Sequence, residues 1–120
     1  VEFDDIWRWG VYHPGCPTVA AALAAAQAHR TDMAALLRAM TAGYEVSCRI
    51  AQAVQPSHYD FWHTTGTVGT FGAAAAVAVL LDCDATQTAH AIATAATMAG
   101  GLQLVSQIGT SRAVMTGVTA

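Results

Sequence analysis

The stretch "HYDFWHTTGTVGTFGAAAAVAVLL", residues 58–81, begins with polar residues and ends almost entirely apolar. Residues 61–81 are numerous enough to cross a bilayer, but their apolar content is mostly Ala and Gly, and they include His63 and several Thr. The glycines at 66, 69 and 72, followed by alanines at 73–76, give a smooth face that another backbone can approach closely. We therefore expect a fully buried packing helix over about 65–81 and not a membrane span.

Helix-forming patterns surround this segment on both sides. Further helices are expected at about 17–29, 32–54 and 85–99. Thr31 can cap the second of them, and Gly43 within it indicates close approach of a neighbouring helix. Asp84 and Gln87 have the spacing of a capping box, and glycines at 100–101 are suited to ending the last helix. A weak strand pattern appears only at "LQLVS", and residues 1–16 form an irregular loop. The expected fold is all-α, with residues 1–120 as a single helical domain.

Composition excludes several functional classes. The net charge of −3 and the absence of a basic cluster argue against nucleic-acid binding. The chain contains no lysine, so it cannot supply a Schiff-base or general-base lysine. Its three cysteines form no CxxC pair, which favours a reducing, cytoplasmic setting with the thiols as small buried groups. Charged residues make up only 11% of the chain, so part of the surface is expected to meet another protein surface.

Four features are candidates for chemistry. They are the acids Glu2, Asp4 and Asp5, the "HPG" of His13–Gly15, the segment from His58 to His63, and Arg112 with its flanking hydroxyls. Each has a structural alternative: acids cap helices or solvate loops, and a lone histidine before proline is more often a turn residue. The spacing of His58, Asp60 and His63 matches no established zinc pattern, so no metal is expected. "HTTGTVG" is better suited to recognising an anion through threonine hydroxyls and the N–H groups at a helix start.

Taken together, "FDD", "HPG", "GYEVSCRIAQAV", "FWHTTGTVGTFGAAAAVAVLL" and "AIATAATMAGGL" resemble, in order and spacing, the MmgE/PrpD family. That family includes 2-methylcitrate dehydratase, cis-aconitate decarboxylase and iminodisuccinate epimerase, which act on small polycarboxylates without a metal or organic cofactor. The resemblance covers the whole chain and implies an internal piece of the large helical domain of a longer, dimeric enzyme with a separate lid domain. By that comparison, the lid and the further family residues that it carries would lie beyond Ala120.

The resemblance also implies roles for individual residues. His13 and His63 fall on the two active-site histidines of the family. The family's Asp before "FDD" and Thr after it are replaced by Glu2 and Ile6, and its lysine falls near Arg112. An arginine can hold a carboxylate bidentately but is a poor proton shuttle. The catalytic candidates are thus His13, His63 and Glu2, and the substrate-binding candidates are Arg112, Thr64, Thr65 and Asp5.

The implied function is a cofactor-independent lyase, a dehydratase or decarboxylase, acting on a di- or tricarboxylate. Two alternatives remain: a non-catalytic or repurposed helical module that binds a small molecule or partner protein, and the same scaffold redirected to epimerisation or cyclisation. The expected partners are the polycarboxylate and either a second copy or the remainder of a longer chain, with no nucleic acid and no membrane.

Overall fold

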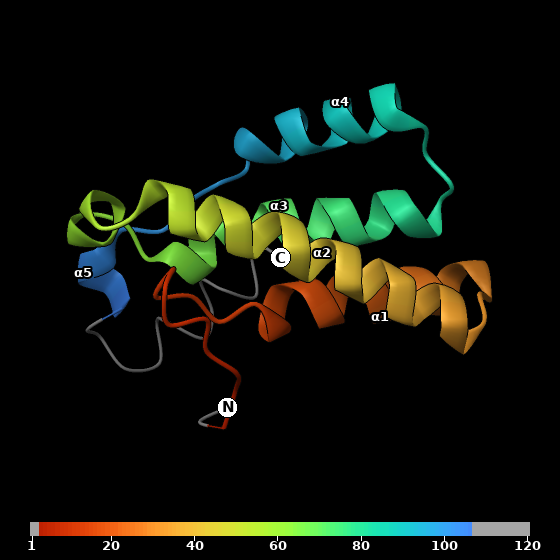
Figure 1. Cartoon of the computed structure of the whole chain (residues 1–120), viewed down its shortest axis with the longest axis horizontal. Coiled ribbons are helices and arrows are strands. Elements are labelled where there is room, and N and C mark those ends of the chain that lie inside the picture. Colours follow the sequence, from red (N-terminus) through yellow and green to blue (C-terminus); the bar gives the residue numbers. More distant parts are fainter. Residues whose placement is uncertain (1–2, 107–120) are drawn as a thin grey trace.

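The structure is a computed structural model that describes residues 3–106 (Figure 1). Its helices are α1 (Gly15–His29), α2 (Met33–Val54), α3 (Thr64–Leu80), α4 (Ala85–Ala96) and the short α5 (Gln103–Ser106), with the 3-10 turn η1 (Ser57–Asp60) between α2 and α3. In the described part of the chain, strand-like pairing is limited to two isolated bridges, Trp7 with Tyr12 and Trp62 with Leu102. The prediction of an all-α fold is confirmed.

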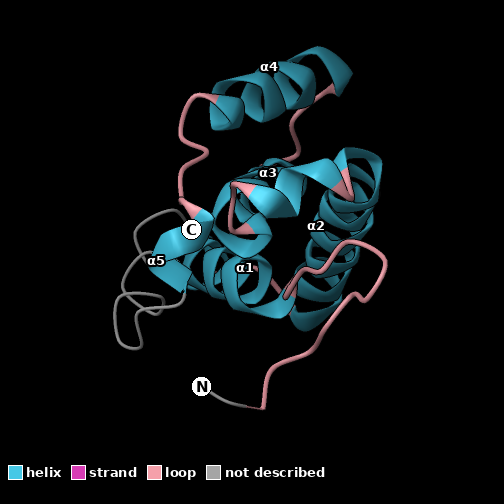
Figure 2. Ribbon diagram, turned by 90° about the vertical axis from the view of Figure 1, so that its left-hand side faces the viewer, coloured by secondary structure: helices cyan, strands magenta, loops and turns pink. Residues whose placement is uncertain are grey.

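The α3 helix lies at the centre and packs against α1, α2 and α4, while α1 and α2 also pack against each other (Figures 1 and 2). Nearly every residue of its first three turns is buried, which confirms the expectation of a buried packing helix. One core cluster lies between the C-terminal parts of α1 and α3 and the N-terminal part of α2. It consists of Ala22, Ala26, Leu36, Ala39, Ala76 and Leu80. A second cluster, of Tyr12, Ala51 and Val68, lies under the N-terminal loop. The first cluster is mostly alanine, so its stability depends on close backbone approach more than on large side chains.

Glycines allow that approach. A β-carbon at Gly43 would lie 2.7 Å from the carbonyl oxygen of Gly72 and 2.5 Å from Cγ2 of Thr18. A β-carbon at Gly69 would lie 2.7 Å from the ring of Pro17. Since real β-carbons are not found this close to other atoms, α1, α2 and α3 could not cross as they do with larger residues here. The prediction of close packing at Gly43 and along α3 is confirmed.

Several helix ends differ from the expectation. The N-cap of α2 is Asp32, whose side chain accepts from the Ala35 N–H, and not Thr31. The shift has a simple cause, because Arg30 takes a left-handed conformation that ends α1 and places Asp32 at the next helix start. "LQLVS" contains the helical turn α5, so the weak strand expectation for it was wrong apart from a bridge at Leu102.

The ends of α1 and α4 also shift. Pro14 precedes α1, so the helix begins two residues before Pro17, which then occupies the first turn. The Asp84–Gln87 capping box is present as predicted. However, α4 ends at Ala96, earlier than the glycines at 100–101. A turn follows, in which Met98 donates to the Ala95 carbonyl.

Candidate functional site

The "HPG" segment is held against the core by the residues before it. Trp7 and Tyr12 exchange backbone hydrogen bonds of 2.7 and 3.3 Å across a tight turn, and Tyr12 is completely buried. Gly10 in this turn lies against Ala51 of α2. Pro14 then starts α1 directly after His13. The histidine therefore lies at a fixed junction between a buried turn and a helix.

The His13 side chain faces two acceptors. Its Nδ1 lies 2.7 Å from the carbonyl oxygen of Asp5 and 3.3 Å from Oδ2 of Asp4. A backbone carbonyl can only accept, so Nδ1 must carry the hydrogen. In the neutral ring, Nε2 then has the lone pair, which is the form required of a general base.

His63 has the opposite arrangement. It is the N-cap residue of α3, is buried, and its Nδ1 accepts from the Thr65 N–H at 3.2 Å. An N–H group can only donate, so Nδ1 must carry the lone pair. A neutral His63 ring then has its hydrogen on Nε2, which is the form that can donate a hydrogen bond from that nitrogen. The backbone N–H of His63 donates to the Gly101 carbonyl, which ties the start of α3 to the segment after α4.

Thr65 connects the two histidines. Its hydroxyl oxygen accepts from the backbone N–H of His13 at 3.2 Å, and its own N–H donates to the His63 ring. These two histidines are fifty positions apart in the chain, yet one buried residue bonds to both. The structure thus brings together three of the residues that the sequence analysis singled out.

The hydroxyls of Thr64 and Thr67 form hydrogen bonds to other groups of the protein. The Thr64 hydroxyl accepts from the Gln55 amide at 3.0 Å, and this amide also donates to the Gly10 carbonyl. The Thr67 hydroxyl lies 2.7 Å from Nε2 of His58 and within 3.3 Å of the His63 carbonyl. Both threonines are buried. The first turn of α3 is therefore bonded internally, and binding of an anion by Thr64 remains a prediction.

His58 has a supporting place beside the site. Its ring stacks on Trp62, with centroids 6.4 Å apart, and bonds to Thr67. Burial lowers the pKa of His58, because its charged form loses hydration. Within residues 3–106 there is no group of three or more His, Cys, Asp or Glu residues placed to hold a metal ion.

The two acids of "FDD" have different contacts. Oδ1 of Asp5 accepts from the Gly15 N–H at 3.0 Å, and Oδ2 accepts from the Tyr44 hydroxyl at 2.9 Å. Asp4 faces His13 and accepts a longer contact of 3.5 Å from the thiol of Cys16. Burial, together with the hydrogen bond to Asp4, raises the pKa of the Cys16 thiol. Ile6 is largely exposed and places no hydrogen-bonding group next to them.

Two predicted site residues, Glu2 and Arg112, lie outside the described residues. Among the described arginines, Arg49 forms an ion pair with Glu45 on α2 and Arg8 lies over the ring of Trp9. Neither recorded ion pair of the described segment brings an arginine to the histidines. Recognition of a substrate carboxylate by Arg112 stays a prediction.

Sequence reasoning missed Tyr44 and Gln55. Tyr44 follows Gly43 in α2 and is 39 positions from its partner Asp5, so no local pattern indicated their contact. Burial, followed by the bond to Asp5, raises the pKa of Tyr44. Gln55, at the end of α2, carried no local signal because its partners Gly10 and Thr64 come from other segments.

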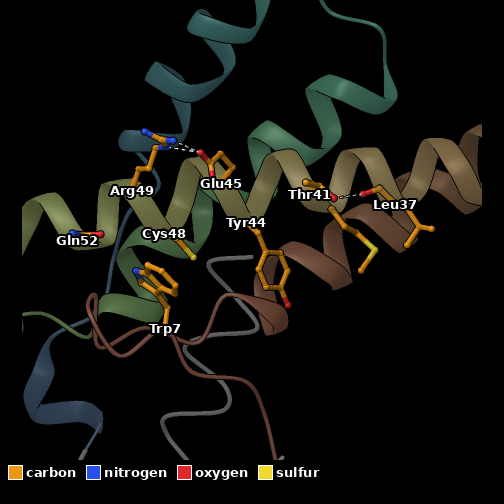
Figure 3. Close-up of a pocket in the computed structure, with 9 residues that line it drawn as sticks. Trp7, Leu37, Thr41, Tyr44, Glu45, Cys48, Arg49 and Gln52 are labelled. Carbon is orange, nitrogen blue, oxygen red and sulfur yellow. Dashed lines mark hydrogen bonds and ion pairs between the residues drawn. The ribbon is translucent and has the colours of Figure 1, made fainter.

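An open groove of about 810 Å³ lies along the outer face of α2, next to Tyr44 (Figure 3). Its lining residues are Trp7, Leu37, Met40, Thr41, Tyr44, Glu45, Cys48, Arg49 and Gln52. Neither His13 nor His63 belongs to it. Among the described helices, none combines the length and the apolar character required to cross a membrane.

The family comparison covers the chain from end to end. The family model for the MmgE/PrpD N-terminal domain matches residues 1–120. Comparison with curated proteins and with solved structures found no match.

Proposed function

Because the chain belongs to the MmgE/PrpD family, of which it represents the N-terminal domain, we propose that it carries two catalytic histidines of a cofactor-independent lyase acting on a small di- or tricarboxylate. The observation that carries the proposal is the pair of opposite tautomers joined by Thr65. One ring is bonded so that its outer nitrogen can accept a proton, and the other so that its outer nitrogen donates a hydrogen bond.

His13 is the base. Its Nδ1–H is directed to the Asp5 carbonyl, so Nε2 can take a proton from a carbon next to a substrate carboxylate. With this proton, the His13 ring is positively charged and lies beside Asp4, whose carboxylate oxygen Oδ2 is 3.3 Å from Nδ1. An opposite charge at this distance stabilises the charged ring as it forms.

His63 is the hydrogen-bond donor to the leaving group. In a dehydration, the C–H electron pair forms the new C=C bond as the C–O bond to the leaving hydroxyl breaks. The Nε2–H group of His63 donates a hydrogen bond to that oxygen as negative charge develops on it, and the His63 ring stays neutral. The proton that His13 took from carbon passes to the departing hydroxide, which leaves as water, so both rings return to their starting state.

The substrate carboxylates require donors as well. Thr65 is the candidate from α3, since its hydroxyl oxygen accepts from His13 and can still donate its own hydrogen. Arg112 is the candidate cation, through bidentate hydrogen bonds. Glu2, for which the family resemblance implies a catalytic role, is the further candidate acid.

A second candidate function is a binding module without turnover. Ile6 favours it, because this exposed residue occupies the position where the family resemblance implies a threonine. Such a module would bind the same acids, but its binding would not depend on the tautomers of the two histidines.

The test is turnover of 2-methylcitrate, citrate, cis-aconitate and iminodisuccinate, followed by proton NMR. His13→Asn keeps a side-chain N–H for the Asp5 carbonyl but lacks Nε2. His63→Asn keeps an N-cap acceptor for Thr65 but lacks the Nε2–H group of the ring. Each is expected to lower turnover by about 100-fold or more.

The matched control is His90→Gln on the exposed side of α4, which should react like the unmodified protein. Turnover that survives both asparagine variants would refute the acid–base assignment. Ligand line broadening without turnover in any variant would support the binding module instead.

A further inference from the structure

Tyr44 reaches the "HPG" turn from a different helix. It lies in the middle of α2, is partly buried, and its hydroxyl donates to Oδ2 of Asp5 at 2.9 Å. The other carboxylate oxygen of Asp5 accepts from the Gly15 N–H at 3.0 Å. Both oxygens of this side chain are thus bonded to fixed parts of the fold, one on α2 and one at the start of α1.

The backbone of Asp5 in turn fixes His13. Its carbonyl oxygen lies 2.7 Å from Nδ1 of His13, the shortest contact of that ring. Asp5 itself is largely exposed and lies in a loop without helical hydrogen bonds of its own. The position of this carbonyl therefore depends on the anchoring of the Asp5 side chain.

Gly15 provides room for this arrangement. A β-carbon there would lie 2.5 Å from Oδ1 of Asp5 and 2.9 Å from the Tyr44 hydroxyl oxygen. Only glycine permits the carboxylate and the phenol to approach the start of α1 together. The glycine of "HPG" is thus explained by the Asp5–Tyr44 pair and not by a special backbone angle.

We infer that Tyr44 is a positioning residue for His13, because it anchors the Asp5 carboxylate and so holds the carbonyl that selects the Nδ1–H tautomer. The inference rests on the proposed function for its catalytic consequence, but its structural content is independent of turnover. Without the phenol hydroxyl, the Asp5 side chain keeps only its hydrogen bond to the Gly15 N–H, so the Asp5 carbonyl is held less firmly. The His13 ring then samples other orientations and the second tautomer.

The variant for the test is Tyr44→Phe, which removes only the hydroxyl and keeps the ring that borders the groove (Figure 3). Tyr59→Phe, on η1, is the matched control. Histidine ring signals are recorded by ¹H–¹⁵N NMR at a pH where the rings are neutral, and His13→Asn identifies the His13 signal. The unmodified protein and the control should show hydrogen on Nδ1, whereas Tyr44→Phe should show a mixture of tautomers.

Kinetics provide a second readout. Because Tyr44 acts on the base and not on substrate contacts, Tyr44→Phe should lower kcat by about 10- to 100-fold and leave KM unchanged. Gly15→Ala should reproduce the tautomer mixture by displacing Asp5. An unaltered His13 tautomer in folded Tyr44→Phe would overturn the inference.

A failure of the proposed function can be distinguished from a failure of the positioning role of Tyr44. If none of the acids reacts but the His13 tautomer still depends on Tyr44, the positioning is supported and the lyase proposal is overturned. If the acids react and Tyr44→Phe changes neither kcat nor the tautomer, the lyase stands and the positioning is refuted.

Discussion

The crossing of α2 and α3 at Gly43 makes a sharp prediction, because helix propensity and packing oppose each other there. Gly43→Ala should gain about 1 kcal/mol from helix propensity. The new methyl group would lie 2.7 Å from the Gly72 carbonyl oxygen and 2.5 Å from Cγ2 of Thr18. The threonine methyl can shift, but the carbonyl belongs to a buried helix backbone.

Overpacking of this kind costs about 1–3 kcal/mol or more, and a backbone obstacle places the cost at the upper end. The net expectation is a loss of about 2 kcal/mol in the free energy of unfolding, which corresponds to a Tm lower by about 8 °C for a domain of this size. Urea and thermal unfolding followed by circular dichroism measure both quantities. Thr18→Ser removes the obstructing Cγ2, so it should recover part of the loss in the double variant.

Ala42→Gly, at the neighbouring position of α2, is the reference for propensity alone and should cost about 1 kcal/mol. If Gly43→Ala is neutral or stabilising, the helices do not cross as closely as described. If Thr18→Ser has the same effect in both backgrounds, the Thr18 methyl is not part of the obstacle.

Three further outcomes are expected. Burial lowers the pKa of His58, so the unfolded chain binds a proton at this histidine more readily than the folded one, and the free energy of unfolding should fall as the pH drops below about 6.5. In urea unfolding at several pH values, His58→Gln should make this fall at acidic pH less steep. Burial raises the pKa of Tyr12 to about 12, so the unfolded chain loses this proton first and stability should fall between about pH 10 and 12; an equally steep fall in Tyr12→Phe would contradict this. Asp84→Ala removes one half of the capping box and should cost about 1 kcal/mol in thermal unfolding, whereas Asp84→Asn, which keeps an acceptor, should cost much less.

Local patterns were enough to specify the helices. The run of glycine and alanine after His63 predicted a fully buried packing helix, because small residues allow close contact with neighbouring backbones. Asp84 and Gln87 predicted a helix start, since a capping box is formed by residues three positions apart. The sequence-based choice of Thr31 as the cap of the second helix was wrong, and Asp32 takes that position, because the start of α2 depends on where the preceding helix ends.

The candidate site likewise has some features that the sequence determined and others that only the tertiary structure determined. Sequence alone placed His13 in a loop before a proline and His63 before a helix, and the family resemblance drew attention to both. Only the tertiary structure placed Thr65 between them and Tyr44 behind Asp5, because these contacts join segments that are far apart in the chain. The tautomer of each ring is also a tertiary property, since the atom facing Nδ1 is a carbonyl in one case and an N–H in the other. Residue type provides an imidazole, and the hydrogen-bond partner of Nδ1 determines whether the outer nitrogen Nε2 has a lone pair or carries the hydrogen.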